Sequence, residues 1–318
     1  MNETNETTVA EHPTIGETAF YLSSGAIGSV FNALVLWIAL RYIDTDDKPR
    51  QIIVINMTAA DLLMCMVYML TRPYLSYFPI FSCHPYYVTI WTVQLVSCLN
   101  LVWLNVDKLI FIQFPLHYYS IVNRKKMLIV AAVTWLLLGY LAVMLDSFLT
   151  VSVGCGTSEL SPYIYLPMCI LYLVMILTSF IISAVIYFIA HTSTRMEARQ
   201  RTKLFHRLFF LFSSTLWTFF TCLPYRALYL MHKLRKNSDS EFLDEVTNIF
   251  FRILVVGTVI NPLITIWTQR IYRMRLLKAF NKWQESSTSE DTAVTVNTRR
   301  PSSKAITTFE GTPFTTSL

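Results

Sequence analysis

Ionisable side chains stand inside long apolar runs of this sequence, where charge is costly. Asp61 lies within "VINMTAADLLMCMVYML", and Asp107 and Lys108 lie near the end of another run, in "NVDKLIFIQFPLHYY". Arg226 follows Pro224 in "CLPYRALYL". A carboxylate at such a depth needs a donor or a cation, and a guanidinium needs an anion or other acceptors. The sequence therefore predicts ion binding or ion pairing within an apolar protein.

The histidines offer no comparable catalytic pattern. They occur at positions 12, 84, 117, 191, 206 and 232, in termini, loops or the ends of apolar runs, and no pair has metal-ligand spacing. A membrane enzyme would also need a nucleophile with its base, or a metal cluster. We therefore expect neither an enzyme nor a resident cofactor, and no nucleic-acid partner.

Composition predicts the elements that carry these residues. The chain is 54% hydrophobic and 14% charged, with a mean hydropathy of +0.46. A transmembrane helix needs about 20 apolar residues. Seven runs qualify, at about 19–41, 51–72, 84–110, 127–149, 163–190, 204–231 and 247–268. Because lipid cannot hydrogen-bond exposed backbone, runs of this length must be helices. The expected fold is an all-α membrane protein, a bundle of seven transmembrane helices in contact with the lipid bilayer.

Basic residues alternate between successive loops. The segment before the first run contains four glutamates and no Lys or Arg, whereas basic clusters follow the first, third, fifth and seventh runs. By the positive-inside rule, the N-terminus is extracellular and the C-terminus cytoplasmic, in a multi-pass protein of the plasma membrane. No basic region followed by a short apolar core and a cleavage site precedes the first run, so we expect no removable signal peptide.

Two features fit an extracellular N-terminus. Asn2 and Asn5 each begin an Asn-x-Thr glycosylation acceptor. Cys83 opens the third run and Cys155 lies in "SVGCGTS", so both face an oxidising space in which a disulfide would tie the loop to the helix. The other four cysteines lie within helices, as small apolar residues.

The segments flanking the bundle differ in character. We expect a glycosylated N-terminus over residues 1–18 and the transmembrane domain over 19–268. In "QRIYRMRLLKAFNKW", large apolar residues recur at helical spacing among basic ones, which predicts an amphipathic eighth helix over 269–283. Residues 284–318 are rich in Ser and Thr and poor in large apolar residues, which predicts a disordered cytoplasmic tail.

Ordered motifs along the runs resemble those of the rhodopsin-like (class A) family of G-protein-coupled receptors, over roughly residues 20 to 283. "DKLIFIQFPLHY" resembles the family's Asp-Arg-Tyr stretch, and "NPLIT" resembles Asn-Pro-x-x-Tyr. Further matches are Asn32, Asp61, Trp135 and Pro224. The resemblance implies a cell-surface receptor that binds an extracellular ligand and activates heterotrimeric G proteins. It also implies receptor kinases and an arrestin as partners of a phosphorylated tail.

The resemblance assigns roles in coupling and activation to Asp107, Lys108, Tyr187, Pro224, Asn261 and Pro262. In the family, the basic residue matching Lys108 is restrained at rest and helps to form the crevice that receives a helix of the G protein. Lysine here lacks the planar fork of arginine. Leu204, with no acid near it, stands where many family members carry a Glu that locks the arginine. Thr265 replaces the Tyr of the family's Asn-Pro-x-x-Tyr motif, Ser179 replaces the Pro of the fifth helix, and Cys222 replaces the Trp of the sixth. We expect a resting state that is less firmly latched. The alternative is that Asp107 and Lys108 are interfacial anchors.

The resemblance also implies an allosteric sodium ion. Asp61, Ser97, Thr258 and Asn261 match the family's sodium-coordinating positions, and oxygen ligands suit a small hard cation. Gly257 stands where the family has a further polar side chain that binds the sodium ion. The alternative is a protonated Asp61, or one that is hydrogen-bonded through water alone.

Pocket-facing positions of the family match Arg72, Ile90, Gln94, Tyr225, Arg226 and Arg252. Ile90 stands where amine receptors carry an Asp, and residues 246–268 contain no Lys for a retinal Schiff base. Three guanidiniums would favour a carboxylate or another anion, unless they snorkel or pair with nearby acids. We expect a peptide ligand, and a neuropeptide first, with a small acidic or lipid-like molecule or a chemosensory cue as alternatives. A transporter is the alternative from another class, although no internal repeat is visible.

Overall fold

The computed structural model describes residues 14–146, 162–192, 198–234, 241–278 and 281. The chain divides into two compact units, Met1–Arg273 and Met274–Leu318. Every element within the described residues is helical, and they contain no strand. The prediction of an all-α protein is therefore confirmed.

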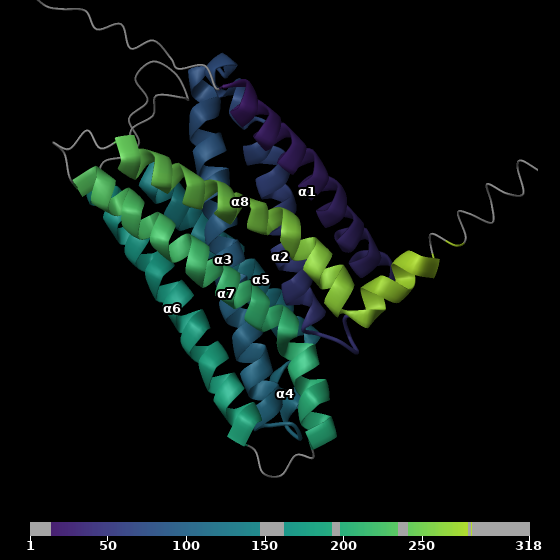
Figure 1. The fold of residues 1–318 in the computed structure, drawn as a ribbon. Coiled ribbons are helices and arrows are strands. Elements are labelled where there is room, and N and C mark those ends of the chain that lie inside the picture. Colours follow the sequence, from purple (N-terminus) through teal and green to yellow (C-terminus); the bar gives the residue numbers. More distant parts are fainter. Residues whose placement is uncertain (1–13, 147–161, 193–197, 235–240, 279–280, 282–318) are drawn as a thin grey trace, which may run out of the picture. The chain divides into compact units, whose positions relative to one another are not determined.

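The first unit holds the long helices that Figure 1 labels. They are α1 (Ile15–Tyr42), α2 (Gln51–Leu63), α3 (Cys83–Gln113), α5 (Arg124–Asp146), α6 (Pro162–Thr192), α7 (Ala198–Leu234) and α8 (Glu241–Thr268). The shorter elements are η1 (Met64–Met69), η2 (Arg72–Tyr77), η3 (Ile80–Ser82) and α4 (Tyr118–Ile121). Residues 270–278 are also helical. In the second unit, little besides the last part of this helix is described.

The helices coincide with the predicted runs and extend a few residues beyond most of them. Within the described residues, six helices are long and apolar enough to cross a membrane: Ile15–Tyr42, Gln51–Met69, Cys83–Gln113, Arg124–Met144, Leu166–Thr192 and Glu245–Thr268. The sixth predicted run, 204–231, lies within α7. The extension has a simple reason, because a helix that satisfies its own backbone can continue past the apolar core into the polar interface.

The second run departs from regular α-helix. After Leu63 the chain enters the π-helix η1, in which the Leu70 N–H donates to the Cys65 carbonyl at 3.2 Å. The 3-10 helix η2 follows, with Pro73 in its first turn. A π-helical turn adds a residue to the normal spacing, so it rotates every later side chain about the helix axis. Helical periodicity read from the sequence therefore fails to place Arg72.

α3 is the central helix of the first unit. It packs against α2, α5, α6 and α7, while α8 packs between α1 and α7. Buried apolar side chains form two clusters, one that includes Tyr68, Tyr86 and Tyr172 and another that includes Leu104 and Leu208. Large apolar side chains also point outward, among them Leu40, Leu136, Tyr140, Phe188 and Trp267. An apolar exterior of this kind suits lipid as the surrounding solvent.

The close approach of α1 to η1 depends on Gly28. A Cβ added there would lie 2.5 Å from the Cys65 thiol and 3.1 Å from a methyl of Val259. Since Cys65 is fully buried, the thiol has no room to move aside. We expect Gly28→Ala to destabilise the purified protein by about 1–3 kcal/mol, as overpacking does.

Gly16 provides the matched control, because nothing lies within 4 Å of a Cβ placed there. Gly16→Ala should leave the melting temperature unchanged or slightly higher, since Ala favours helix. Thermal unfolding of both variants in detergent decides the matter. Equal melting temperatures for Gly28→Ala and Gly16→Ala would contradict the packing described.

Candidate functional site

A cavity lies inside the bundle, between α2, α3, α6, α7 and α8. Its volume of about 80 Å³ is enough for several water molecules or a small ion, but not for a peptide. The predicted site residues among its lining are Asp61, Gln94, Ser97, Arg226, Thr258 and Asn261. One cavity thus joins a buried carboxylate to a buried guanidinium.

The Asp61 carboxylate is held by two other helices. It is 1% exposed, and its Oδ1 accepts a hydrogen bond from the Ser97 hydroxyl of α3 at 3.1 Å. Its Oδ2 accepts one from the Asn261 amide of α8 at 3.0 Å. The hydroxyl of Thr258 lines the same cavity but donates to the Val255 carbonyl at 2.7 Å. The structure thus brings Asp61, Ser97 and Asn261 into direct contact, with Thr258 on the same cavity wall.

Gly257 makes room for an indole in the wall of the same cavity. A Cβ at position 257 would lie 2.5 Å from Trp217 Nε1, and both residues line the cavity. The indole N–H is buried and has no hydrogen-bond partner among the described residues. The space of the missing polar ligand is therefore taken by a donor group, which the sequence analysis did not foresee.

Arg226 is held by side chains from α3 and α6. It is 6% exposed, and its Nη2 donates to the Gln94 Oε1 at 2.8 Å. Its guanidinium carbon lies 4.0 Å from the ring centroid of Tyr172 and 5.1 Å from that of Tyr225. The Tyr172 hydroxyl donates to the same Gln94 oxygen at 3.3 Å. Stacking on an aromatic face and a fixed amide acceptor together orient the guanidinium.

The other predicted pocket residues lie elsewhere. Arg72 is half-buried, with its guanidinium carbon 5.8 Å from the ring centroid of Tyr68. Arg252 is exposed on α8, and Ile90 is buried in the apolar core. Neither arginine lines the cavity that Arg226 lines. The structure therefore does not bring the three guanidiniums together in this cavity.

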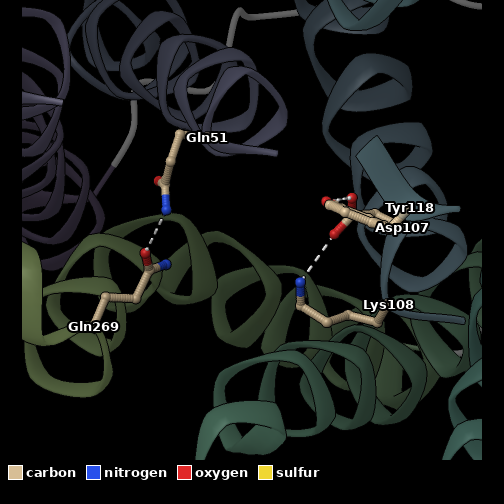
Figure 2. Close-up of polar contacts among 5 residues, drawn as sticks. All are labelled: Gln51, Asp107, Lys108, Tyr118 and Gln269. Atoms are coloured by element: carbon tan, nitrogen blue, oxygen red, sulfur yellow. Dashed lines mark hydrogen bonds and ion pairs between the residues drawn. The ribbon is translucent and has the colours of Figure 1, made fainter. Parts of the chain in front are cut away.

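Asp107 and Lys108 form an ion pair in the last two turns of α3 (Figure 2). Lys108 Nζ lies 2.9 Å from Asp107 Oδ2, with side-chain exposures of 16% and 2%. The Tyr118 hydroxyl of α4 donates to Asp107 Oδ1 at 2.7 Å. Burial raises the pKa of Tyr118, and the neighbouring carboxylate raises it further, so the phenol keeps its proton and remains a donor.

A second polar contact ties the start of α2 to the segment after α8. Gln51 Nε2 donates to Gln269 Oε1 at 3.2 Å, as Figure 2 shows. The Tyr272 hydroxyl donates to Gln51 Oε1 at 3.0 Å, and the Tyr272 side chain is fully buried. Burial also raises the pKa of Tyr272, so this phenol remains protonated. Thr265, in contrast, donates to the Asn261 carbonyl within its own helix at 2.9 Å.

The remaining predicted residues have simpler surroundings. Tyr187 is 47% exposed, with its ring centroid 5.9 Å from that of His191. Pro224 lies inside α7 and Pro262 inside α8, where each removes a backbone donor. Cys83 is buried at the start of α3, but Asn2, Asn5 and Cys155 lie outside the described residues. Glycosylation and the disulfide therefore stay predictions.

The sequence analysis named the charged groups and some of their neighbours, such as Ser97, Asn261 and Gln94, but it missed the aromatic ones. Tyr172 lies in an apolar run, where a tyrosine looks like any interfacial aromatic. Tyr118 matches a family motif, but nothing in the sequence aims its hydroxyl at Asp107. Trp217 reaches the cavity only because residue 257 has no side chain. The only sequence feature that could have indicated the position of Trp217 was the glycine at position 257.

Two comparisons with known proteins show the family to which this chain belongs. The family described as "7 transmembrane receptor (rhodopsin family)" matches residues 31–264. The chain is 62% identical over 297 residues to "G-protein coupled receptor aex-2" of Caenorhabditis elegans, and the alignment covers 92% of each chain. Both matches include the segments that carry Asp61, Asp107 and Arg226. The chain therefore belongs to the rhodopsin family of seven-transmembrane receptors, and it is a cell-surface receptor that acts through G proteins and not an enzyme.

Proposed function

We propose that this receptor binds an extracellular peptide, a neuropeptide in the first instance, and that Arg226 binds an anionic group of that ligand. The observation that carries the proposal is the geometry of Arg226, whose buried guanidinium is oriented by Gln94 and Tyr172 on the wall of a cavity. A charge removed from water is costly unless an opposite charge and hydrogen bonds compensate it. A carboxylate is the ligand group that suits a guanidinium best.

The size of the cavity favours a ligand that inserts only one small group. About 80 Å³ accommodates a carboxylate or a short side chain, so the rest of the ligand must lie outside the cavity. Aromatic side chains that are exposed near Arg72 offer contact area of the kind that peptides use, namely Tyr74, Tyr77 and Phe81. A small acidic or lipid-like molecule would use Arg226 in the same way and is the second candidate.

The end of the bundle that holds Asp107 is proposed to face the cytosol and the G protein. The positive-inside rule supports this orientation. Leu116 is 93% exposed and Tyr119 68% exposed in the segment that follows α3, where they offer apolar area to a partner. The same orientation places Asn2, Asn5 and a Cys83–Cys155 disulfide outside. It places the tail, with its proposed receptor-kinase and arrestin sites, inside.

An allosteric sodium ion fits the Asp61 end of the cavity. Asp61, Ser97 and Thr258 supply one carboxylate and two hydroxyl groups to the same cavity, and hard oxygen ligands suit sodium. Asn261 would orient the carboxylate through its amide. The bound ion would place a positive charge directly at the carboxylate, which forms no ion pair with any residue that the structure describes.

Lys108→Ala should abolish signalling while ligand binding persists, because the ammonium is proposed to contact the G protein. We would measure cAMP and calcium in cells exposed in parallel to peptide, amine and lipid libraries, with surface expression matched. A peptide-evoked response lost in Lys108→Ala is expected. A response evoked only by amines, or one that survives Lys108→Ala, would count against this proposal.

Arg226→Ala should lower the potency of the ligand found in this way by about 10–100-fold, since a hydrogen bond to a charged group contributes about 1.5–3 kcal/mol. Arg226→Lys should recover part of the loss, because it keeps the charge and loses the fork. Arg252→Ala should have a smaller effect, since that side chain is exposed. Unchanged potency in Arg226→Ala would eliminate the anion site.

Sodium should raise the melting temperature of the purified receptor when it replaces choline at equal ionic strength. Mass action gives about 1.4 kcal/mol at a sodium concentration tenfold above Kd. Asp61→Asn should remove this difference. Asp46→Asn is the matched control, because Asp46 is an exposed partner of Arg124 at 2.7 Å and should leave the sodium effect intact. The proposal fails if wild type melts alike in both salts.

A further inference from the structure

A cluster of neutral polar side chains joins α3 to α6 deep in the bundle. Asn105 of α3 is fully buried, and its Nδ2 donates to the Ser179 hydroxyl at 2.7 Å. Its Oδ1 accepts a hydrogen bond from the Ser183 hydroxyl at 2.6 Å. Ser179 and Ser183 both belong to α6 and are also buried. These short contacts tie the two helices firmly at this depth.

The same cluster reaches α7 through one hydroxyl, that of Thr215. Asn105 Nδ2 lies 3.4 Å from Thr215 Oγ1, and Ser183 Oγ lies 3.3 Å from it. An amide nitrogen has only two N–H groups and a serine only one O–H. The Asn105 amide already donates to Ser179 and, at 3.0 Å, to the Leu101 carbonyl. The contacts to Thr215 are the longest of the cluster, so these polar side chains hold α7 less tightly than they hold α6.

The position of the cluster connects it with coupling. Asn105 stands two residues before Asp107 on α3, just inside the Asp107–Lys108 pair. That pair lies within one helix, so it does not itself hold α3 to α6 or α7. A helix is about 10 Å wide, so a partner's helix can enter this end only if neighbouring helices part. The contact that yields most readily is the one to Thr215.

We propose that Asn105, with Ser179, Ser183 and Thr215, is the resting-state latch of this receptor, a positioning cluster that holds α7 in place until the G protein couples. The latch uses neutral hydrogen bonds where an ion pair between helices could have served. Ser179 supplies the hydroxyl that accepts from the Asn105 amide, and a proline at this position could not supply one. Loss of the Thr215 hydroxyl should therefore release α7 without added ligand.

The test uses the full-length receptor reconstituted with a panel of Gα subunits, and it measures nucleotide exchange without ligand. Thr215→Val keeps the shape of the side chain and removes its hydroxyl. We expect basal exchange to rise about threefold, the change that an average interhelical hydrogen bond in a membrane protein corresponds to. Asn105→Leu removes the contacts of Asn105 to Ser179, Ser183 and Thr215, leaves only the Ser183–Thr215 contact, and should exceed that rise. Thr215→Ser should restore the wild-type level.

Thr221→Val is the matched control on the same helix. Thr221 is 6% exposed, and its hydroxyl donates to the Trp217 carbonyl of its own helix at 2.7 Å. A merely structural role would lower the melting temperature of Thr215→Val without raising basal exchange. The proposal is overturned if Thr215→Val does not exceed Thr221→Val with any Gα subunit. If Asn105→Leu fails to fold, Thr215→Val alone decides.

Discussion

Burying a polar or charged group away from water is costly unless partners surround it, and in this receptor the partners come from other helices. Asp61 is held by Ser97 and Asn261, and Arg226 by Gln94 and Tyr172. Lipid offers no hydrophobic force that would pull apolar helices together, so packing and such contacts must fix their arrangement. The buried polar groups thus determine the order of the bundle as much as they determine its function.

α3 contributes a residue to each of these contacts along its length. Between the cavity and the Asp107 end, Asn56 donates to the Asn100 side chain at 2.9 Å, and the Trp135 indole donates to Asn56 at 2.6 Å. The α3 members, in order, are Gln94, Ser97, Asn100, Asn105 and Asp107. These α3 side chains contact partners on α2, α4, α6 and α7, so one helix runs through all of these polar clusters.

The sequence was sufficient to predict where the helices lie and at which level of the bundle each charged residue stands. Both predictions rest on the length of the apolar runs and the order of the motifs, which can be read from the chain alone. It was insufficient for the direction in which side chains point. The π-helix at Met64–Met69 rotates Arg72 away from regular spacing, and Arg252 lies on an exposed face of α8. Neither effect has a clear local signature. Whether a side chain such as Tyr172 contacts a charged group also depends on how two helices are rotated relative to each other. The sequence of one helix does not determine that rotation.

The choice of neutral groups for the Asn105 latch has a physical consequence. An ion pair at the end of a bundle weakens as salt rises and is lost when one partner titrates. Amide and hydroxyl groups do not titrate near neutral pH, and salt does not screen a fully buried contact. Each such bond in a membrane protein is worth only about 0.6 kcal/mol on average. A latch of this kind therefore gives a resting state that is insensitive to its surroundings yet separated from the coupled state by a small free energy, in keeping with the replacement of arginine by Lys108.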